Sequence, residues 1–523
     1  MEEEYSVDDP TQLLEAASDF ALYSGVQNDA SVKSFLDRFP LPVIINALQT
    51  KADVPGLERG LVACLERVFQ TKYGAYLIPH YMSFVQVGLK ADSQIVRCLA
   101  CKTVTCLLEH MKEDVVSAVQ LIRDYDVCPL LLDCLINGNE QVATASMDAI
   151  KKLAGFPQGM EIIFPTNSED DTHLGKLAAR CSSLGRVRVL ALIVKLFSVS
   201  SHVASVIHRL NLLRLFEAEL NNTDDILVTL SVLELLYELS EIQHGREFLS
   251  GNTLLQLLSS IISNTSIESI LRSRAMMISG RLLHGSCMFV DESNTKTVIS
   301  AIDRILDSSE TQDMDECESA LEALGQIGSS TQGAQLLLSS SPPSARHIID
   351  AAFDRQGRGK QLAALHALGN IFGETLAENN MILDNHSEEN LRRLIYETAS
   401  KTPKLAPSGL IMSVLQQDSE IRLAGYRMIT GLMARPWFLM EICSKQEIIN
   451  IVTDPNTETT KIGMEARYNC CKAIHKALMS SSKVISDPSL AAIAEKVHEA
   501  VRMGPYLARK LEAQPAVMTA ERF

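Results

Sequence analysis

The chain is poor in the residues that build sheet proteins and tight turns. Among its 523 residues there are only 1 Trp, 11 Tyr and 15 Phe, and Gly (26) and Pro (17) are also few. The frequent turns that short strands require are therefore missing. Because 46% of the residues are still hydrophobic, the core must consist of Leu, Ile, Val, Ala and Met. Such a core is typical of stacked helices, and its apolar content is too high for general disorder.

The chain also lacks an excess of basic residues. It has 48 Lys and Arg against 64 Asp and Glu, a formal net charge of −16. Nucleic-acid binding takes most of its affinity from Lys and Arg that displace counterions. Since no run such as KKRK occurs either, we expect no nucleic acid among the partners.

No segment of the chain predicts export or membrane insertion. The N-terminus, MEEEYSVDDP, is acidic and lacks the pattern of a secretory signal. The apolar stretch LPVIINAL, from Leu41, is too short to cross a bilayer. The twelve cysteines are scattered singly or in pairs. We therefore expect reduced thiols in a cytoplasmic protein that makes no membrane contact. We also expect the protein to enter the nucleus and to be a monomer when free.

Signatures of catalysis and of cofactor binding are missing as well. GxxxxGK[ST], GxSxG and HExxH do not occur, so phosphate binding, nucleophile-elbow and zinc-protease chemistry have no visible basis. Cys98-Leu-Ala-Cys101 has the spacing of half a zinc site, but no second pair follows; we interpret both as small apolar helix residues. His244-Gly-Arg is interpreted as a helix that ends at glycine, with a surface or capping histidine. We expect a protein without cofactor, metal or enzymatic activity.

An internal repeat dominates the chain. A helical phrase recurs in which two adjacent apolar residues are followed, three positions after the second, by another; LHALGNIFG, from Leu365, is its clearest copy. Taking the first residue of each adjacent pair as an anchor gives ten positions. Eight of the nine intervals lie between 39 (64 to 103) and 46 (103 to 149), and one is 61 (367 to 428). The anchors are Cys64, Thr103, Ala149, Leu192, Leu235, Ile278, Ala323, Ala367, Met428 and Ala473.

A period near 43 residues is typical of armadillo and HEAT repeats. One such unit cannot bury its own apolar face, and stacking on its neighbours supplies the missing surface. Acids such as Asp225 and Asp418 precede phrase helices and can cap their free N–H groups. The sequence therefore predicts an all-α armadillo/HEAT solenoid, a curved superhelix of about ten to eleven repeats.

The spacing also predicts the organisation of the chain. We expect an acidic N-terminal segment with capping helices at 1–40, the repeat array at 41–500 and a C-terminal tail at 501–523. The interval of 61 residues predicts an insertion between repeats at 375–417, with a helix around 388–399 and more exposure than its surroundings.

The phrase helix lines the concave groove in armadillo repeats, where the residues one before and three after the anchor point into it. Proteins that carry nuclear-import cargo place Trp and Asn there to hold basic peptides. Here the single Trp437 lies outside these positions and only Asn370 fits the Asn column, so we expect a mixed-charge surface for a protein partner; a merely solvated face is the alternative. The candidate groove residues are Lys102, Lys152, Lys195, Glu234, Glu238, Arg281, Glu322, Gln326, His366, Asn370, Arg427, Lys472 and Lys476.

The end of the chain carries a resemblance to a known family. The segment RPWFLMEICSKQEIINIVTDPNTETTKIGMEARYNCCKAI, from Arg435, is similar to the closing segment of the family of 26S proteasome non-ATPase regulatory subunit 5. HGREFL, from His244, and Gly504-Pro505-Tyr506 continue the likeness. The resemblance implies an armadillo/HEAT horseshoe that binds the C-terminal domain of one proteasomal ATPase subunit, promotes assembly of the base and is absent from the finished 26S particle.

The resemblance also implies other base subunits as further partners. Two alternatives remain open from the residues themselves. One is a general armadillo scaffold, for a ubiquitin ligase or the cytoskeleton; the other is an enzyme with an unrecognised site.

Overall fold

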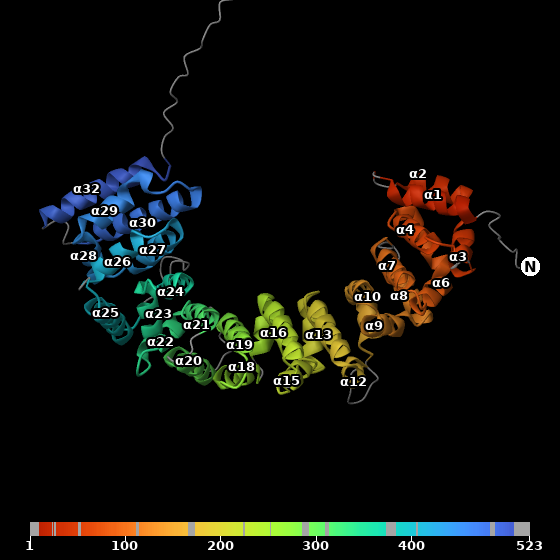
Figure 1. Cartoon of the computed structure of the whole chain (residues 1–523), viewed down its shortest axis with the longest axis horizontal. Helices are drawn as coiled ribbons and strands as arrows, with labels where there is room; N and C mark the ends of the chain where they lie inside the picture. Colours follow the sequence, from red (N-terminus) through yellow and green to blue (C-terminus); the bar gives the residue numbers. More distant parts are fainter. Residues whose placement is uncertain are drawn as a thin grey trace, which may run out of the picture. The chain divides into compact units, whose positions relative to one another are not determined.

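The computed structural model describes residues 10–23, 25, 28–50, 54–110, 115–165, 173–222, 225–250, 253–284, 292–308, 313–372, 383–403, 406–481 and 487–506. Every regular element in these ranges is a helix, which confirms the predicted all-α class (Figure 1). In the same ranges no helix is long and apolar enough to cross a membrane. Contacts divide the chain into two compact units, unit 1 (Met1–Phe248) and unit 2 (Leu249–Phe523).

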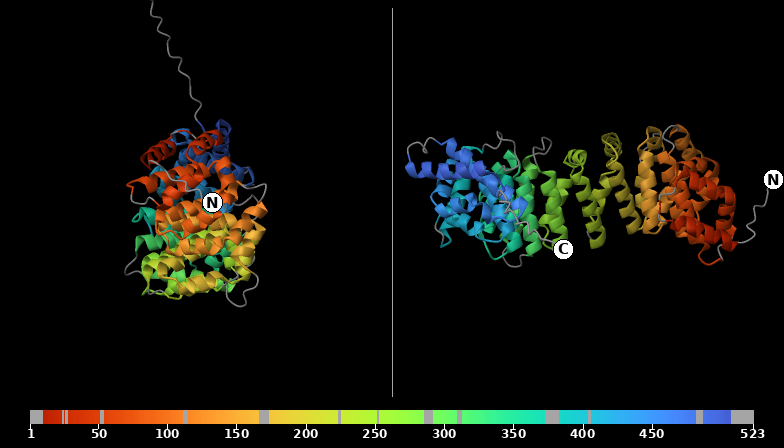
Figure 2. Two further views of the ribbon diagram at one scale, coloured as in Figure 1. Left: turned by 90° about the vertical axis from the view of Figure 1, so that its right-hand side faces the viewer. Right: turned by 90° about the horizontal axis from the view of Figure 1, so that it is seen from above.

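Five helices of unit 1 carry the recurring phrase and form its central row. These phrase helices pack each on the next along the chain, and the anchors Cys64, Ala149 and Leu192 are fully buried between them (Figures 1 and 2). They are α4 (Leu57–Phe69), α7 (Gln94–His110), α10 (Glu140–Ala154), α13 (Ser183–Phe197) and α16 (Ile226–Glu241).

Shorter helices connect the phrase helices of unit 1 and cover their apolar sides. The first helix, α1, packs on α4 and so begins the row. The other helices are α1 (Pro10–Leu22), α2 (Asp29–Arg38), α3 (Leu41–Thr50), α5 (Lys72–Leu77), η1 (Ile78–Tyr81), α6 (Met82–Leu89), α8 (Val115–Asp124), α9 (Val127–Asn137), α11 (Pro157–Ile163), α12 (His173–Arg180), α14 (Ser201–Arg209), α15 (Arg214–Leu220) and α17 (Gln243–Ser250).

Unit 2 repeats the same plan, with five phrase helices and a closing helix. Its phrase helices are α19 (Ser269–Leu282), α21 (Met314–Ile327), α24 (Arg358–Ile371), α27 (Ser419–Leu432) and α30 (Lys461–Met479). Helix α18 (Leu254–Ser263) precedes them, and α32 (Pro488–Met503) packs on α30 at the end. Between them lie α20 (Glu292–Asp307), α22 (Thr331–Ser339), α23 (Ala345–Phe353), α25 (Asn385–Ser400), α26 (Pro407–Leu415), α28 (Pro436–Cys443), α29 (Gln446–Thr453) and η2 (Pro455–Thr457). All ten predicted anchors thus lie on phrase helices, and the predicted solenoid of stacked repeats is confirmed.

Small residues let the phrase helices of unit 2 approach each other closely. A Cβ added to Gly280 would lie 2.8 Å from the Cα of Ala323 on the next helix. One added to Gly325 would lie 2.6 Å from the Cα of Ala367. Both glycines stand two residues after an anchor and face the anchor of the following helix, so the repeat fixes a backbone-to-backbone contact that no larger residue fits.

The predicted caps are present. The Asp225 carboxylate accepts hydrogen bonds from two backbone N–H groups at the start of α16, at 3.1 and 3.2 Å. Asp418 does the same for α27, at 3.0 and 3.3 Å. Each carboxylate satisfies N–H groups that have no partner inside the helix, which fixes where the phrase helix begins.

The segment predicted as an exposed insertion, 375–417, is packed into the array where the structure describes it. Helix α25 precedes α26 and α27 just as α22 precedes α23 and α24, and most of α26 is buried. Buried Leu391 and Ile395 pack α25 into unit 2. The extra length lies partly in α25, which has 16 residues where α22 has 9. The expectation of greater exposure is therefore wrong for residues 383–403 and 406–417, and 375–382 lie outside the described residues.

The segment that carries the family resemblance fastens α25 to the array. Arg435, buried just before α28, places its Nε 3.0 Å from a carboxylate oxygen of Glu388 on α25. The indole Nε1 of Trp437 donates to the same carboxylate at 3.2 Å. Separating the buried Arg435 guanidinium from the Glu388 carboxylate would leave a buried charge without its partner, at a cost in stability. Arg435 and Trp437 therefore hold α25 in place.

The interpretation of His244 as the end of a helix is wrong. His244 lies at the start of α17, which continues through Gly245. Its Nε2 lies 2.9 Å from the carbonyl oxygen of Phe197 at the end of α13, and its ring stacks on that of Phe197. The histidine therefore joins two repeats within unit 1 instead of capping a terminus.

The predicted ends of the chain are only partly described. Helices α1 and α2 lie within the predicted N-terminal segment 1–40. The predicted tail 501–523 is described as far as Tyr506, whose hydroxyl donates to Glu465 of α30. The domain boundaries themselves stay predictions.

Candidate partner-binding surface

The thirteen candidate groove residues lie on one side of the phrase helices, where seven of them are exposed and six are partly buried. None of them is buried. The same side continues toward the start of each helix, at the positions eight and five before the anchor, because a helix returns to one face every three or four residues. We call these four positions the exposed strip: eight, five and one before the anchor, and three after it. From α10 to α30, no strip residue is buried.

Ion pairs connect neighbouring phrase helices along the strip of unit 1. Lys102 Nζ on α7 lies 2.7 Å from a carboxylate oxygen of Glu66 on α4. Lys152 on α10 makes the same 2.7 Å contact with Glu109 on α7. Partial burial lowers the pKa of Lys102, but the Glu66 carboxylate outweighs it and raises that pKa above its usual value. Because both pairs are partly exposed to solvent, they add little to stability.

The strip of unit 1 changes character from helix to helix. On α10 all four positions are exposed and polar. On α13 they are apolar except for Lys195, and on α16 two leucines are followed by Glu234 and Glu238. In chain order the strips are Gln141, Thr144, Asp148 and Lys152, then Leu184, Val187, Ala191 and Lys195, then Leu227, Leu230, Glu234 and Glu238.

The strip of unit 2 is acidic on α21 and ends in two lysines on α30. On α21 it contains Asp315, Glu318 and Glu322, with Gln326 Nε2 donating to Glu322 at 3.1 Å. On α30 it ends in Lys472 and Lys476. The side chains of Ile270, Met277 and Arg281 lie on the α19 strip. The strip thus carries acidic charge alone on α21, whereas on α30 Glu465 precedes the two lysines.

A histidine and an arginine meet between two helices of this strip. His366 Nδ1 on α24 lies 3.3 Å from Arg427 Nη1 on α27. Burial first, and then the Arg427 charge, lower the pKa of His366. The imidazole is therefore neutral at pH 7 and accepts a hydrogen bond from the guanidinium, so the positive charge at this point belongs to Arg427. Asn370 stands one turn further along α24.

The residues with metal-ligand chemistry are used in packing. In unit 2, Asp303 and Asp307 of α20 lie near His347 of α23. Arg346 lies 3.0 Å from Asp303 and 2.8 Å from Asp307, so a guanidinium already neutralises both carboxylates. Burial and Arg346 lower the pKa of His347, which keeps it neutral. This cluster fastens α20 to α23 and is a poor site for a divalent cation.

The CxxC pair behaves as the sequence interpretation states. Cys98 and Cys101 are both buried in α7. Burial is the largest cause of the raised pKa of Cys98, and it disfavours the thiolate that a metal requires. Both cysteines pack as small apolar residues.

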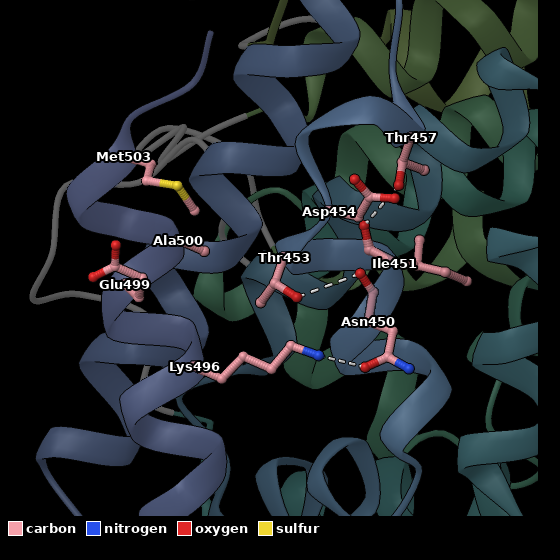
Figure 3. A pocket seen from close by; sticks show the side chains of 9 residues that line it. All are labelled: Asn450, Ile451, Thr453, Asp454, Thr457, Lys496, Glu499, Ala500 and Met503. Carbon is pink, nitrogen blue, oxygen red and sulfur yellow. Dashed lines mark hydrogen bonds between the residues drawn. The ribbon is translucent and has the colours of Figure 1, made fainter. Parts of the chain in front are cut away.

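A depression of about 490 Å³ lies in unit 2 between α29, η2 and α32 (Figure 3). Several of its polar groups already have partners: Lys496 Nζ donates to Asn450 Oδ1 at 2.6 Å, and Asp454 accepts from the backbone of η2. Ile451, Ala500 and Met503 supply apolar surface. No nucleophile with an adjacent base lines it, and it lies on connecting helices, away from the strip.

Sequence reasoning identified half of the strip. The predicted positions are the two in each repeat that lie one before and three after the anchor, and the strip adds the two that lie eight and five before it. The residues that the prediction missed include Leu184, Leu227 and Ile270, all exposed leucine or isoleucine side chains eight residues before an anchor. The helical period of the repeat itself could have found them.

Comparison with known proteins supports the family resemblance of the sequence, along most of the chain. The family model described as "Proteasome non-ATPase 26S subunit" matches residues 60–522, which include all ten anchors. The 26S proteasome non-ATPase regulatory subunit 5 of Bos taurus is 21% identical over 432 residues, 82% of this chain and 81% of that protein. The protein of the same description from Homo sapiens has the same identity and coverage.

A solved structure of Kap121p is also similar in outline, with a TM-score of 0.46 and 13% identity, covering 94% of this chain and 53% of that one. The assignment of family depends instead on the model that spans the repeats. The chain belongs to the family of proteasome non-ATPase 26S subunits.

Proposed function

We propose that the chain is a non-catalytic assembly chaperone for the base of the 26S proteasome regulatory particle, and that it binds the C-terminal domain of an ATPase subunit. The observation that carries the proposal is the exposed strip, in a member of a proteasome subunit family. Stacked helices present polar, apolar and charged side chains along it, while the described clusters of titratable groups are used in packing. Such a surface suits binding and offers no acid–base pair for catalysis.

The composition of the strip favours a folded domain over an extended basic peptide. Peptide-binding grooves of import adaptors need Trp and Asn at repeated positions, whereas Trp437 lies in α28 with its indole bound to Glu388. Lys195 on α13 lies on the helix next to the one that carries Glu234 and Glu238, and the acids of α21 stand apart from the lysines on α30. Separate patches of opposite sign orient a folded partner, because like charges placed opposite each other are penalised.

Affinity purification of the tagged chain followed by mass spectrometry tests the proposal. Recovery of proteasomal ATPases and other base subunits without the full 20S core supports assembly. Stoichiometric recovery of mature 26S particles would instead indicate a permanent subunit. Recovery of neither, with a ubiquitin ligase or cytoskeletal protein in their place, would favour the general scaffold.

A direct binding experiment tests the finer part of the proposal. The isolated C-terminal domain of each proteasomal ATPase subunit is titrated against the full chain by calorimetry. We expect one of the domains to bind in a one-to-one complex and the others to bind at least tenfold more weakly. Equal binding of all domains, or of none, would contradict the assignment of one ATPase partner.

The compartment and the oligomeric state follow as parts of the same proposal. Base assembly requires the chain where the ATPases are made and assembled, so we propose the cytoplasm, with the nucleus as a second location. We also propose that the free chain is a monomer, since its strip is reserved for a different protein. Light scattering of the purified chain and imaging of a tagged copy test these statements.

A further inference from the structure

Two adjacent phrase helices of unit 1 expose leucines where solvent-facing helices carry polar residues. Helices α13 and α16 pack side by side. On their strips Leu184 is 59% exposed and Leu227 is 76% exposed, and Val187 and Leu230 follow one turn later, half-buried. Ile226, beside Leu227, is also exposed. We call Leu184, Val187, Ala191, Leu227 and Leu230 the apolar patch.

The neighbouring helix shows that this exposure is not a property of the repeat. On α10 the strip positions that correspond to Leu184 and Val187 are Gln141 and Thr144, both exposed. The solvent face of a packed helix is normally polar, as on α10. An isolated exposed leucine needs no explanation, but several on one face of two packed helices form a contiguous surface, which in soluble proteins marks an interaction site.

The charges that border the apolar patch indicate the chemistry of its occupant. Further along the same strip, α16 continues with Glu234 and Glu238, and α13 ends in Lys195. From the position eight before the anchor to the position three after it, the strip spans 12 residues, about 16 Å of helix. A partner that covers this length meets apolar side chains over one half. Over the other half it meets the two carboxylates of α16, with Lys195 of α13 beside them.

We propose that the apolar patch, with Glu234 and Glu238 beside it, binds an amphipathic helix that has an apolar stripe and basic residues at one end. A helix fits because its residues spaced three and four apart can pack against the ridges that the side chains of two packed helices form. Charge complementarity selects a basic end, which pairs with the two carboxylates. The inference deepens the proposed function and rests on it, by naming the part of the partner domain that unit 1 contacts.

The first test removes the apolar patch without touching the core. Leu184→Ser with Leu227→Ser should weaken binding of the ATPase C-terminal domain by about tenfold or more, since apolar contacts at the centre of an interface dominate affinity. The matched control is Leu22→Ser with Val116→Ser, which removes two equally exposed apolar side chains elsewhere in unit 1. Binding by the patch variant at the wild-type level, or an equal loss in the control, would overturn the inference.

The second test uses a probe of defined chemistry. An 18-residue helical peptide with leucines at i, i+3, i+4 and i+7 and lysines at one end is labelled and titrated by fluorescence anisotropy. We expect the full chain to bind it, the patch variant to bind it at least tenfold more weakly, and Glu234→Lys with Glu238→Lys to lose binding. A peptide with glutamates in place of the lysines should bind the charge-reversed chain better than the wild type.

The two tests separate this inference from the proposed function. If no ATPase domain binds but the peptide follows the charge swap, the patch chemistry stands and the proteasomal partner is wrong. If an ATPase domain binds equally well to the patch variant, the proposed function stands and the inference fails. A peptide that ignores both the leucines and the charge swap also contradicts the inference.

Discussion

Each phrase helix has a buried side, which packs against adjacent repeats and which we call the seam, and the exposed strip. The two sides have different roles although their residues are neighbours in the sequence. On α21, Ala320, Leu321 and Ala323 are fully buried against adjacent repeats, while Asp315 and Glu322 on the opposite side are exposed. The seam supplies free energy of folding through apolar burial and close contact. The strip supplies almost none, because exposed charges are solvated in both states. Stability and binding should therefore respond to different substitutions on the same helix.

The largest loss of stability is expected from a substitution in the seam. Leu236 of α16 is 1% exposed, so Leu236→Ala leaves a cavity and should lower the free energy of unfolding by about 2–5 kcal/mol. Urea denaturation followed by circular dichroism measures the loss. Leu227→Ala on the strip of the same helix is the matched control, and an equal loss there would mean that the helix is rotated relative to our description.

A smaller loss is expected where two backbones touch. Gly325→Ala would place a Cβ 2.6 Å from Ala367 and push α21 away from α24. Overpacking of this kind costs about 1–3 kcal/mol. Gly359→Ala provides the comparison, since the only near contact there is the flexible end of Glu318. If Gly325→Ala proved neutral in thermal denaturation, the close approach of the helices would be contradicted.

The cap of α27 should contribute still less to the free energy of unfolding, and its contribution should depend on pH. Asp418→Ala should cost about 1 kcal/mol through loss of the cap. The hydrogen bond from Arg358, followed by backbone N–H groups, holds the pKa of Asp418 below its usual value. Its contribution is therefore present at neutral pH and is lost as the pH falls through the lowered pKa.

The variant Asp418→Asn tests the sign of that pH dependence. Asparagine keeps the capping oxygen but has no charge to titrate. Unfolding free energies of the two chains should therefore converge as the pH falls below the usual Asp range. A gap that grew on acidification would show that the sign is wrong.

The smallest effect on stability is expected on the strip. Glu238→Ala should change the free energy of unfolding by less than about 0.5 kcal/mol, as exposed substitutions usually do. The same urea experiment applies, with Leu236→Ala as the reference. A loss of 2 kcal/mol or more would place Glu238 in the structural part of the helix and remove the basis for assigning it to a partner.

The sequence predicts the seam better than the strip because burial repeats and surface chemistry does not. The spacing of the anchors predicts all ten phrase helices, and acids such as Asp225 mark where some of them begin. The leucines of the apolar patch occur in only two repeats of unit 1, so the pattern that all repeats share does not contain them. Glu388 and Arg435 meet across 47 residues, a contact that no local pattern contains. The spacing of the anchors alone therefore predicts an insertion where the structure has packed helices.

One measurement tests most directly whether the strip binds the proteasomal partner. Glu234→Lys with Glu238→Lys is compared with Glu2→Lys and Glu3→Lys, an equal change of charge in the acidic N-terminus, in association kinetics with the ATPase C-terminal domain at several salt concentrations. The variant Glu234→Lys with Glu238→Lys should associate more slowly and bind at least tenfold more weakly, most strongly at low salt. The reason is that charges facing the partner steer its approach. The free energy of unfolding of this variant should stay close to that of the wild type. Equal weakening by the N-terminal reversal would show that only net charge matters, and the strip would then not be the binding surface.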